Sequence, residues 1–142
     1  MKDHARYEVS VKIILRKENK LLILIDNDNF WDFPGGRVSS SETQVPFLDI
    51  IKREIKEELG EDITYRMGGP AMVFTRHLEE QEEPVLIVAF EAKYKKGDIK
   101  LSKEHKSYKW INLNEKLLRS SFYSNDEYLS FLDYLKNNNI VL

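Results

Sequence analysis

The chain has 142 residues, a length that suits one domain with a buried core, and its 42% hydrophobic content is ordinary for a globular protein. A formal net charge of −2 gives no indication of nonspecific binding to nucleic acid or to a membrane surface. There is no cysteine for disulfides or thiol chemistry, and no apolar run approaches the roughly 20 residues of a membrane span. We therefore expect one cytoplasmic domain over residues 1–142, without a membrane partner.

The first part of the chain predicts two strands and an aromatic segment. Residues 7–16 alternate apolar and polar side chains, as in a strand with one buried face. Residues 21–25 form a continuous apolar run, which is expected of a strand covered on both faces. The aromatic side chains of residues 30–34 could stack on a nucleobase, but we expect Trp31 and Phe33 to pack in the core.

The next stretch combines a glycine pair with a helix that is rich in carboxylates. Gly35 and Gly36 permit a ligand to approach the backbone closely. A helix is predicted from a cap at Thr43 to about Leu59. Three glutamates share one face of this helix, because positions three and four apart are neighbours on a helix: Glu54, Glu57 and Glu58.

These glutamates have two interpretations. They could form a solvated face that pairs with neighbouring lysines, as charged helices often do. Alternatively, they surround a cation, because carboxylate oxygens are ligands of magnesium and the three charges otherwise repel one another. Glu58 also lies beside an apolar stripe, where a carboxylate is costly unless it is paired or metal-bound. Together with the preceding glycine pair, this position favours the metal site.

The second half of the chain predicts further strands and a helix. Residues 63–67 form a short strand that the following Gly-Gly-Pro ends. Residues 71–78 and 84–94 form a hairpin around an acidic, solvated loop. A short strand at 108–113 and a helix at 127–138 follow. This order of elements predicts an α/β sandwich in which helices flank a mixed sheet.

A motif in the glycine and helix region resembles the Nudix box. That pattern is Gly, five residues, Glu, seven residues, then Arg-Glu-apolar-x-Glu-Glu-x-Gly-apolar. Ten residues rather than seven separate Glu42 from Arg53, and Glu61 stands where the pattern has an apolar residue. The three additional residues could lengthen the helix or widen the loop before it. The matching positions are Gly36, Glu42, Arg53, Glu54, Ile55, Glu57, Glu58 and Gly60.

The resemblance implies a Nudix-like α/β/α sandwich, similar to MutT, in which a mixed β-sheet is flanked by helices. It also implies hydrolysis of a diphosphate linkage in a nucleoside diphosphate linked to a further group X. Such substrates are small nucleotides, including nucleoside triphosphates, nucleotide sugars and dinucleotides. The implied cofactor is Mg²⁺, or Mn²⁺ in its place. The implied metal ligands are the carbonyl of Gly35 and the carboxylates of Glu54, Glu57 and Glu58.

Further roles follow from the same resemblance. Arg53 would orient Glu54 or Glu57, and Glu42 would pair with Arg53 or hold a metal-bound water. Glu54 is either a third metal ligand or the general base. Glu104 precedes an aromatic strand and competes with Glu54 for the role of base.

The remaining expectations concern proton transfer, the substrate and an alternative function. His105 is a further candidate base, because histidine titrates near neutrality. Gly36 and Arg76 are expected to contact the substrate. The alternative is a noncatalytic, nucleotide-binding regulatory module on the same fold. The intact glutamates argue against that module and the three additional residues argue for it, while monomer and homodimer both stay open.

Overall fold

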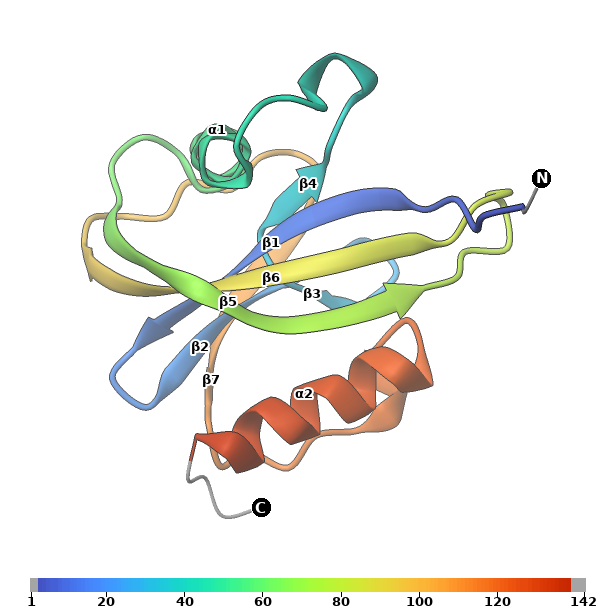
Figure 1. The fold of residues 1–142 in the computed structure, drawn as a ribbon. Coiled ribbons are helices and arrows are strands. Elements are labelled where there is room, and N and C mark those ends of the chain that lie inside the picture. Colours follow the sequence, from blue (N-terminus) through green and yellow to red (C-terminus); the bar gives the residue numbers. More distant parts are fainter. Residues whose placement is uncertain (1–2, 139–142) are drawn as a thin grey trace.

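The computed structural model describes residues 3–138 as a sheet with a helix on either side (Figure 1). No helix within residues 3–138 combines the length and the apolar composition that a membrane span requires. Short 3₁₀ turns at Ser40–Glu42 and Arg119–Ser121 precede the two helices. The main elements are β1 (Glu8–Lys17), β2 (Lys20–Ile25), β3 (Trp31–Asp32), β4 (Gly35–Arg37), α1 (Phe47–Leu59), β5 (Thr64–Arg76), β6 (Val85–Lys96), β7 (Ser107–Asn112) and α2 (Asn125–Asn137).

The seven strands form one mixed sheet in the order β3-β2-β1-β6-β5, with β4 beside β1 and β7 beside β2. β1 and β6 run parallel, and the other pairs are antiparallel. β1 pairs with β2 only next to their turn, at Arg16 and Lys17. Farther along β1, Lys12 faces Gly35 of β4 instead. This splaying of the β1–β2 hairpin places the glycine pair directly beside the central strands.

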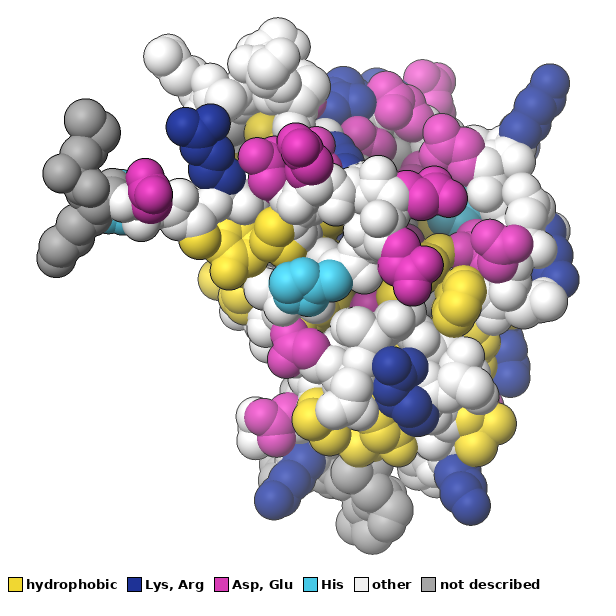
Figure 2. All heavy atoms as spheres, turned by 90° about the vertical axis from the view of Figure 1, so that its right-hand side faces the viewer, with side chains coloured by type: hydrophobic (Ala, Val, Ile, Leu, Met, Phe, Trp, Pro, Cys, Tyr) yellow, Lys and Arg dark blue, Asp and Glu magenta, His cyan; other side chains and the backbone are white. Residues whose placement is uncertain are grey.

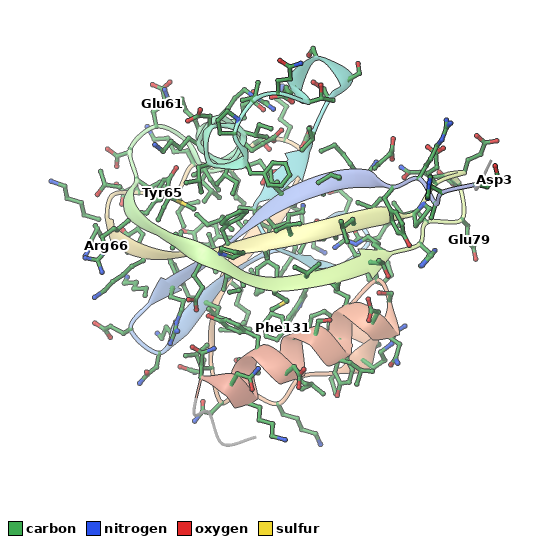
Figure 3. The ribbon with its side chains drawn as sticks, in the orientation of Figure 1. Asp3, Glu61, Tyr65, Arg66, Glu79 and Phe131 are labelled. Atoms are coloured by element: carbon green, nitrogen blue, oxygen red, sulfur yellow. The ribbon has the colours of Figure 1, made fainter. Side chains whose placement is uncertain are left out.

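Two hydrophobic cores lie on opposite faces of the sheet, one under each helix. Ile13 and Leu15 of β1 enter the core under α1, whereas Ile14 enters the core under α2. Phe131 of α2 points toward the sheet (Figure 3) and is fully buried. The predicted α/β/α sandwich is therefore confirmed. The expectation that β1 has only one buried face is wrong, because helices cover both faces and residues 10–15 are all buried.

The segment around Gly68-Gly69-Pro70 does not end a strand as predicted. β5 runs continuously from Thr64 to Arg76 and absorbs these residues as irregularities, where its register with β6 shifts. A bulge can accommodate glycine and proline on an edge strand without ending it. The Gly-Gly-Pro segment therefore marks a shift in register within one strand, and the predicted break between two strands is wrong.

The start of α1 also differs from the prediction. The helix begins at Phe47 with Pro46 as its N-cap, so Thr43 lies in the loop before it. The ten residues between Glu42 and Arg53 therefore divide into a loop at 43–46 and the start of α1 at 47–52. At α2, Ser124 is the N-cap, and its hydroxyl accepts a hydrogen bond of 3.2 Å from the backbone N–H of Glu127.

Candidate active site

A cleft with two adjoining halves runs along β4. Its halves measure about 330 Å³ and 300 Å³, and both are lined by Gly35, Gly36, Arg37, Glu58 and Glu104. The larger half is acidic, since its further lining consists of Glu54, Glu57 and Ser102. The smaller half carries both signs of charge, since its further lining consists of Ser10, Lys12, Asp32, Arg76, Val85 and His105.

Glu58, in the last turn of α1, connects the helix to the glycine pair. Its side chain turns toward the sheet, and the residue is only 6% exposed. The backbone N–H of Gly35 donates a 2.9 Å hydrogen bond to its Oε2. Burial raises the pKa of Glu58 to about 7, although Lys12 and the Gly35 hydrogen bond act in the opposite direction. Glu58 is thus a buried carboxylate that proton or cation binding would stabilise.

Glu54 lies one helical turn earlier and rests against Gly36. A Cβ atom at Gly36 would lie 2.4 Å from Cδ and 2.5 Å from both carboxylate oxygens of Glu54. Burial raises the pKa of Glu54, while Arg53 opposes this shift. The absence of a side chain at Gly36 is therefore what allows the Glu54 carboxylate to occupy its position in the cleft.

Arg53 holds the acidic half together through three carboxylates. Its Nη2 lies 2.8 Å from Glu42 and 3.2 Å from Glu54, and its Nη1 lies 3.1 Å from Glu57. The backbone N–H of Ser39 donates to the other oxygen of Glu42 at 3.1 Å and is the main cause of the lowered pKa of Glu42. The contact from Glu42 to Arg53 thus spans the loop at 43–46.

The loop before β7 brings two further predicted residues to the cleft. The backbone N–H of Ser102 donates to the carbonyl of Glu58 at 3.1 Å, which attaches this loop to the end of α1. Glu104 lines both halves of the cleft, and His105 lines the smaller half. Nδ1 of His105 is buried and has no hydrogen-bond partner among residues 3–138, and burial lowers the His105 pKa.

Arg76 lies at the end of β5 within a buried network of charges. Its guanidinium lies 2.6 Å from Glu127 and 3.2 Å from Asp32, and Nζ of Lys12 lies 3.2 Å from the other oxygen of Asp32. The guanidinium also lies 4.3 Å from the ring centroid of Tyr123. Arg76 lines the cleft, but two carboxylates engage its charge, so its predicted contact with substrate stays a prediction.

Lys12 and Asp32, which line the smaller half as an ion pair, were not predicted from the sequence. Burial alone would raise the pKa of Asp32, but Lys12 and Arg76 outweigh it and lower that pKa below its ordinary value. The available signals were a lysine in the middle of an apolar strand and an aspartate flanked by two aromatics. Both are charged residues in segments otherwise suited to burial.

The donor set of the acidic half suits a hard cation. Within residues 3–138, no group of three or more His, Cys, Asp or Glu side chains is already arranged to hold a metal ion. Arg53 engages Glu54 and Glu57, and Gly35 engages Glu58. However, the donors are carboxylates on one helix face, and burial raises the pKa of two of them, so a cation would compensate their charge. The residues therefore fit a divalent metal.

Comparison with known proteins identifies the family of this domain. The model of the NUDIX domain matches residues 6–131. A MutT protein from Methanosarcina mazei is similar in structure, with a TM-score of 0.72 and 26% identity over 97% of this chain and 99% of that protein. An ADP-ribose pyrophosphatase from Streptococcus suis has a TM-score of 0.67 and 17% identity over 94% of this chain and 92% of that protein.

A UDP-X diphosphatase has a TM-score of 0.69 and 16% identity over 97% of this chain, which spans 66% of the length of that protein. At these identities, the likeness to the diphosphatase and to the S. suis enzyme shows the fold alone. No curated protein sequence matches the chain. Because the domain model covers most of the chain, this protein belongs to the Nudix hydrolase family. The predicted enzyme class, a Nudix-type pyrophosphohydrolase, is confirmed by this membership.

Proposed function

We propose that this protein hydrolyses a diphosphate linkage in a nucleoside diphosphate linked to a further group X, with Mg²⁺ or Mn²⁺ as cofactor. The observation that carries this proposal is a pair of carboxylates, the half-buried Glu54 and the buried Glu58, held beside Gly36 and Gly35. A divalent metal bound there would neutralise the diphosphate and lower the pKa of a bound water. The names of two structural neighbours, UDP-X diphosphatase and ADP-ribose pyrophosphatase, agree with a substrate of this class.

The residues of the acidic half divide into holding, orienting and proton-accepting roles. Glu57, Glu58 and the carbonyl of Gly35 would hold the metal, and Glu54 is either a further ligand or the base. Arg53 contacts Glu54 and Glu57 directly and would fix the direction of both carboxylates. In this role Arg53 positions its neighbours and does not itself react.

The proton of the attacking water needs an acceptor in the cleft. Glu54 and Glu104 both line the acidic half, so each can reach a water held there. Glu54 has a raised pKa because of burial, which makes it a stronger base than an ordinary glutamate. We therefore place Glu54 first and Glu104 second. Gly36 and Arg76 remain the proposed contacts for substrate.

A noncatalytic, nucleotide-binding module is the second candidate. It is favoured by the departure from the Nudix pattern between Glu42 and Arg53, where ten residues stand in place of seven. A regulatory domain would use the same cleft for binding without turnover. The cytoplasmic location expected from the sequence stays a prediction.

One experiment separates the two candidates. Release of phosphate, pyrophosphate and nucleoside monophosphate is measured from nucleoside triphosphates, nucleotide sugars, dinucleotides and dinucleoside polyphosphates, with Mg²⁺ or with a chelator. Metal-dependent release from any member supports the hydrolase and identifies its substrate. Tight nucleotide binding with no release from any member supports the regulatory module and contradicts the catalytic proposal.

A further inference from the structure

A row of three cations crosses the sheet outside the cleft. Arg16 of β1 pairs in register with Lys93 of β6, and Lys93 in turn pairs with Arg66 of β5. Residues paired across neighbouring strands project from the same face of a sheet, so the three side chains lie in one row. Neighbouring strands lie about 4.8 Å apart, and the row therefore spans roughly 10 Å.

This arrangement of like charges is unfavourable by itself. Like charges placed directly opposite each other on neighbouring strands repel, and here the repulsion acts at both junctions of the row. Within residues 3–138, Arg66 and Lys93 form no ion pair. Arg16 is shared between Glu91 at 3.4 Å and the side chain of Asn138 at 3.1 Å. An anion placed across the row would relieve the repulsion between all three cations.

The row lines a hollow of about 420 Å³, in the size range of small-molecule sites. Two carboxylates also line it. Glu91 accepts a 2.5 Å hydrogen bond from the hydroxyl of Tyr134, in addition to the contact from Arg16, and Glu18 is exposed at the β1–β2 turn. The rest of the lining is backbone-rich and lies where β5 leaves its register with β6; it consists of Met67, Gly68 and Ala92.

The hollow is separate from the catalytic cleft. It shares no lining residue with either half of the cleft. Arg16 lies four positions beyond Lys12 on the same strand, which corresponds to roughly 13 Å along an extended chain. Arg66 lies at the end of the sheet opposite to Asp3 and Glu79 (Figure 3). Acidic side chains gather on the face seen in Figure 2, on the Asp3 and Glu79 side of the molecule.

We infer that this hollow is a second ligand site, which binds the phosphate group of a small molecule through Arg16, Arg66 and Lys93. Arginine forks and a lysine ammonium are the groups that bind phosphate oxygens best in proteins. A row of only three cations around a hollow suits a compact phosphate and is too short to track a nucleic-acid backbone. The phosphate can come from free inorganic phosphate or from the phosphate chain of a nucleotide. The site does not depend on the proposed catalytic function.

The test is a titration followed by ¹H–¹⁵N spectra of the full chain, with a chelator present and without phosphate buffer. Inorganic phosphate and a nucleoside diphosphate are titrated separately, and sodium chloride of equal ionic strength is the blank. We expect saturable shifts of the amides of Met67, Gly68 and Ala92. The ligand that saturates these amides at the lower concentration identifies the source of the phosphate group. The amides that line the catalytic cleft, such as that of Gly36, give separate signals, so binding in the cleft is distinguished from binding in the hollow.

A matched pair of variants tests the charge requirement. Arg66→Gln with Lys93→Gln should weaken phosphate binding at the hollow at least tenfold. Lys95→Gln with Lys96→Gln removes the same charge from exposed positions of β6 that do not line the hollow, and should change affinity less than twofold. The inference is overturned if the three amides do not shift in the wild type, if sodium chloride shifts them equally, or if both double variants lose affinity alike.

Discussion

The backbone N–H of Gly35 and the carboxylate of Glu58 form a 2.9 Å hydrogen bond that joins β4 to the last turn of α1. The two residues lie 23 positions apart in the chain, so this bond fixes the glycine pair against the glutamate-rich helix. It does not fully compensate the burial of the carboxylate, since the pKa of Glu58 is still raised to about 7.

The raised pKa of Glu58 should make the metal-free protein less stable as pH rises. The folded state holds the Glu58 proton more tightly than the unfolded state does, so stability falls between pH 4.5 and about pH 7 and then levels off. The free energy of unfolding should fall by about 3 kcal/mol, because the pKa rises from 4.5 to about 7 and each pKa unit corresponds to about 1.36 kcal/mol. Urea unfolding at pH 4 and pH 8 with a chelator measures it.

Glu58→Gln is the control for this pH profile, because other titrating groups contribute equally to both proteins. The free energy of unfolding of the variant minus that of the wild type should be about 3 kcal/mol larger at pH 8 than at pH 4. Mg²⁺ at pH 8 should stabilise the wild type more than the variant, because metal binding replaces the proton. Parallel pH profiles for the two proteins would show that Glu58 does not titrate in this range.

Gly36→Ala should reduce activity while preserving the fold. The new Cβ would displace the carboxylate of Glu54, which is the end of a flexible side chain, so stability should change by less than about 1 kcal/mol. We expect kcat/KM to fall at least about tenfold, because a small displacement of a reacting group is costly. Gly69→Ala is the matched control, since a Cβ at Gly69 meets no atom within 4 Å. Equal activity of the two variants would contradict the placement of Glu54.

Glu57→Gln should abolish metal-dependent turnover without loss of stability. The Glu57 side chain is 59% exposed, so replacing it by an amide of similar size should change the free energy of unfolding by less than about 0.5 kcal/mol. Glu61→Gln is the control, since it removes an exposed carboxylate just past the helix. Steady-state kinetics at several Mg²⁺ concentrations and thermal unfolding measure both effects. Full activity of Glu57→Gln would show that the metal site is misplaced.

Arg76→Met should destabilise the protein by about 3–5 kcal/mol, because Glu127 and Asp32 would lose a buried cationic partner. Adding Glu127→Gln should cost less than the sum of the single changes, by about 1–3 kcal/mol. Chemical denaturation of the four proteins measures this coupling. Unchanged stability with a raised KM would instead favour the substrate contact predicted for Arg76 from the sequence.

The parts of the site that sequence could predict are those set by helical periodicity. Glu54, Glu57 and Glu58 share a face because of their spacing alone, and that spacing places Arg53 within reach of Glu57. The position of Glu42 depended on the path of the loop at 43–46, and the Arg53 contact forms because this loop folds back to the helix.

The charged network beside the smaller half of the cleft could not be predicted in the same way. Lys12, Asp32, Arg76 and Glu127 come from β1, β3, β5 and α2, and only the pairing of distant segments brings them together. The continuity of β5 was also hidden, because glycine and proline indicate a local break and a bulge alike. Local patterns thus predicted local geometry, whereas the charged network needed the topology.

The parallel pairing of β1 with β6 governs the order in which this protein can fold. Every residue of that ladder finds its partner about 77 positions later in the chain, from Glu8 with Val85 to Arg16 with Lys93. Closing such long loops costs entropy before any contact compensates for it, which slows folding. During synthesis the central sheet can assemble only after β6 has emerged from the ribosome. Until then the apolar side chains of β1 and β2 are not buried, so they can aggregate or bind chaperones.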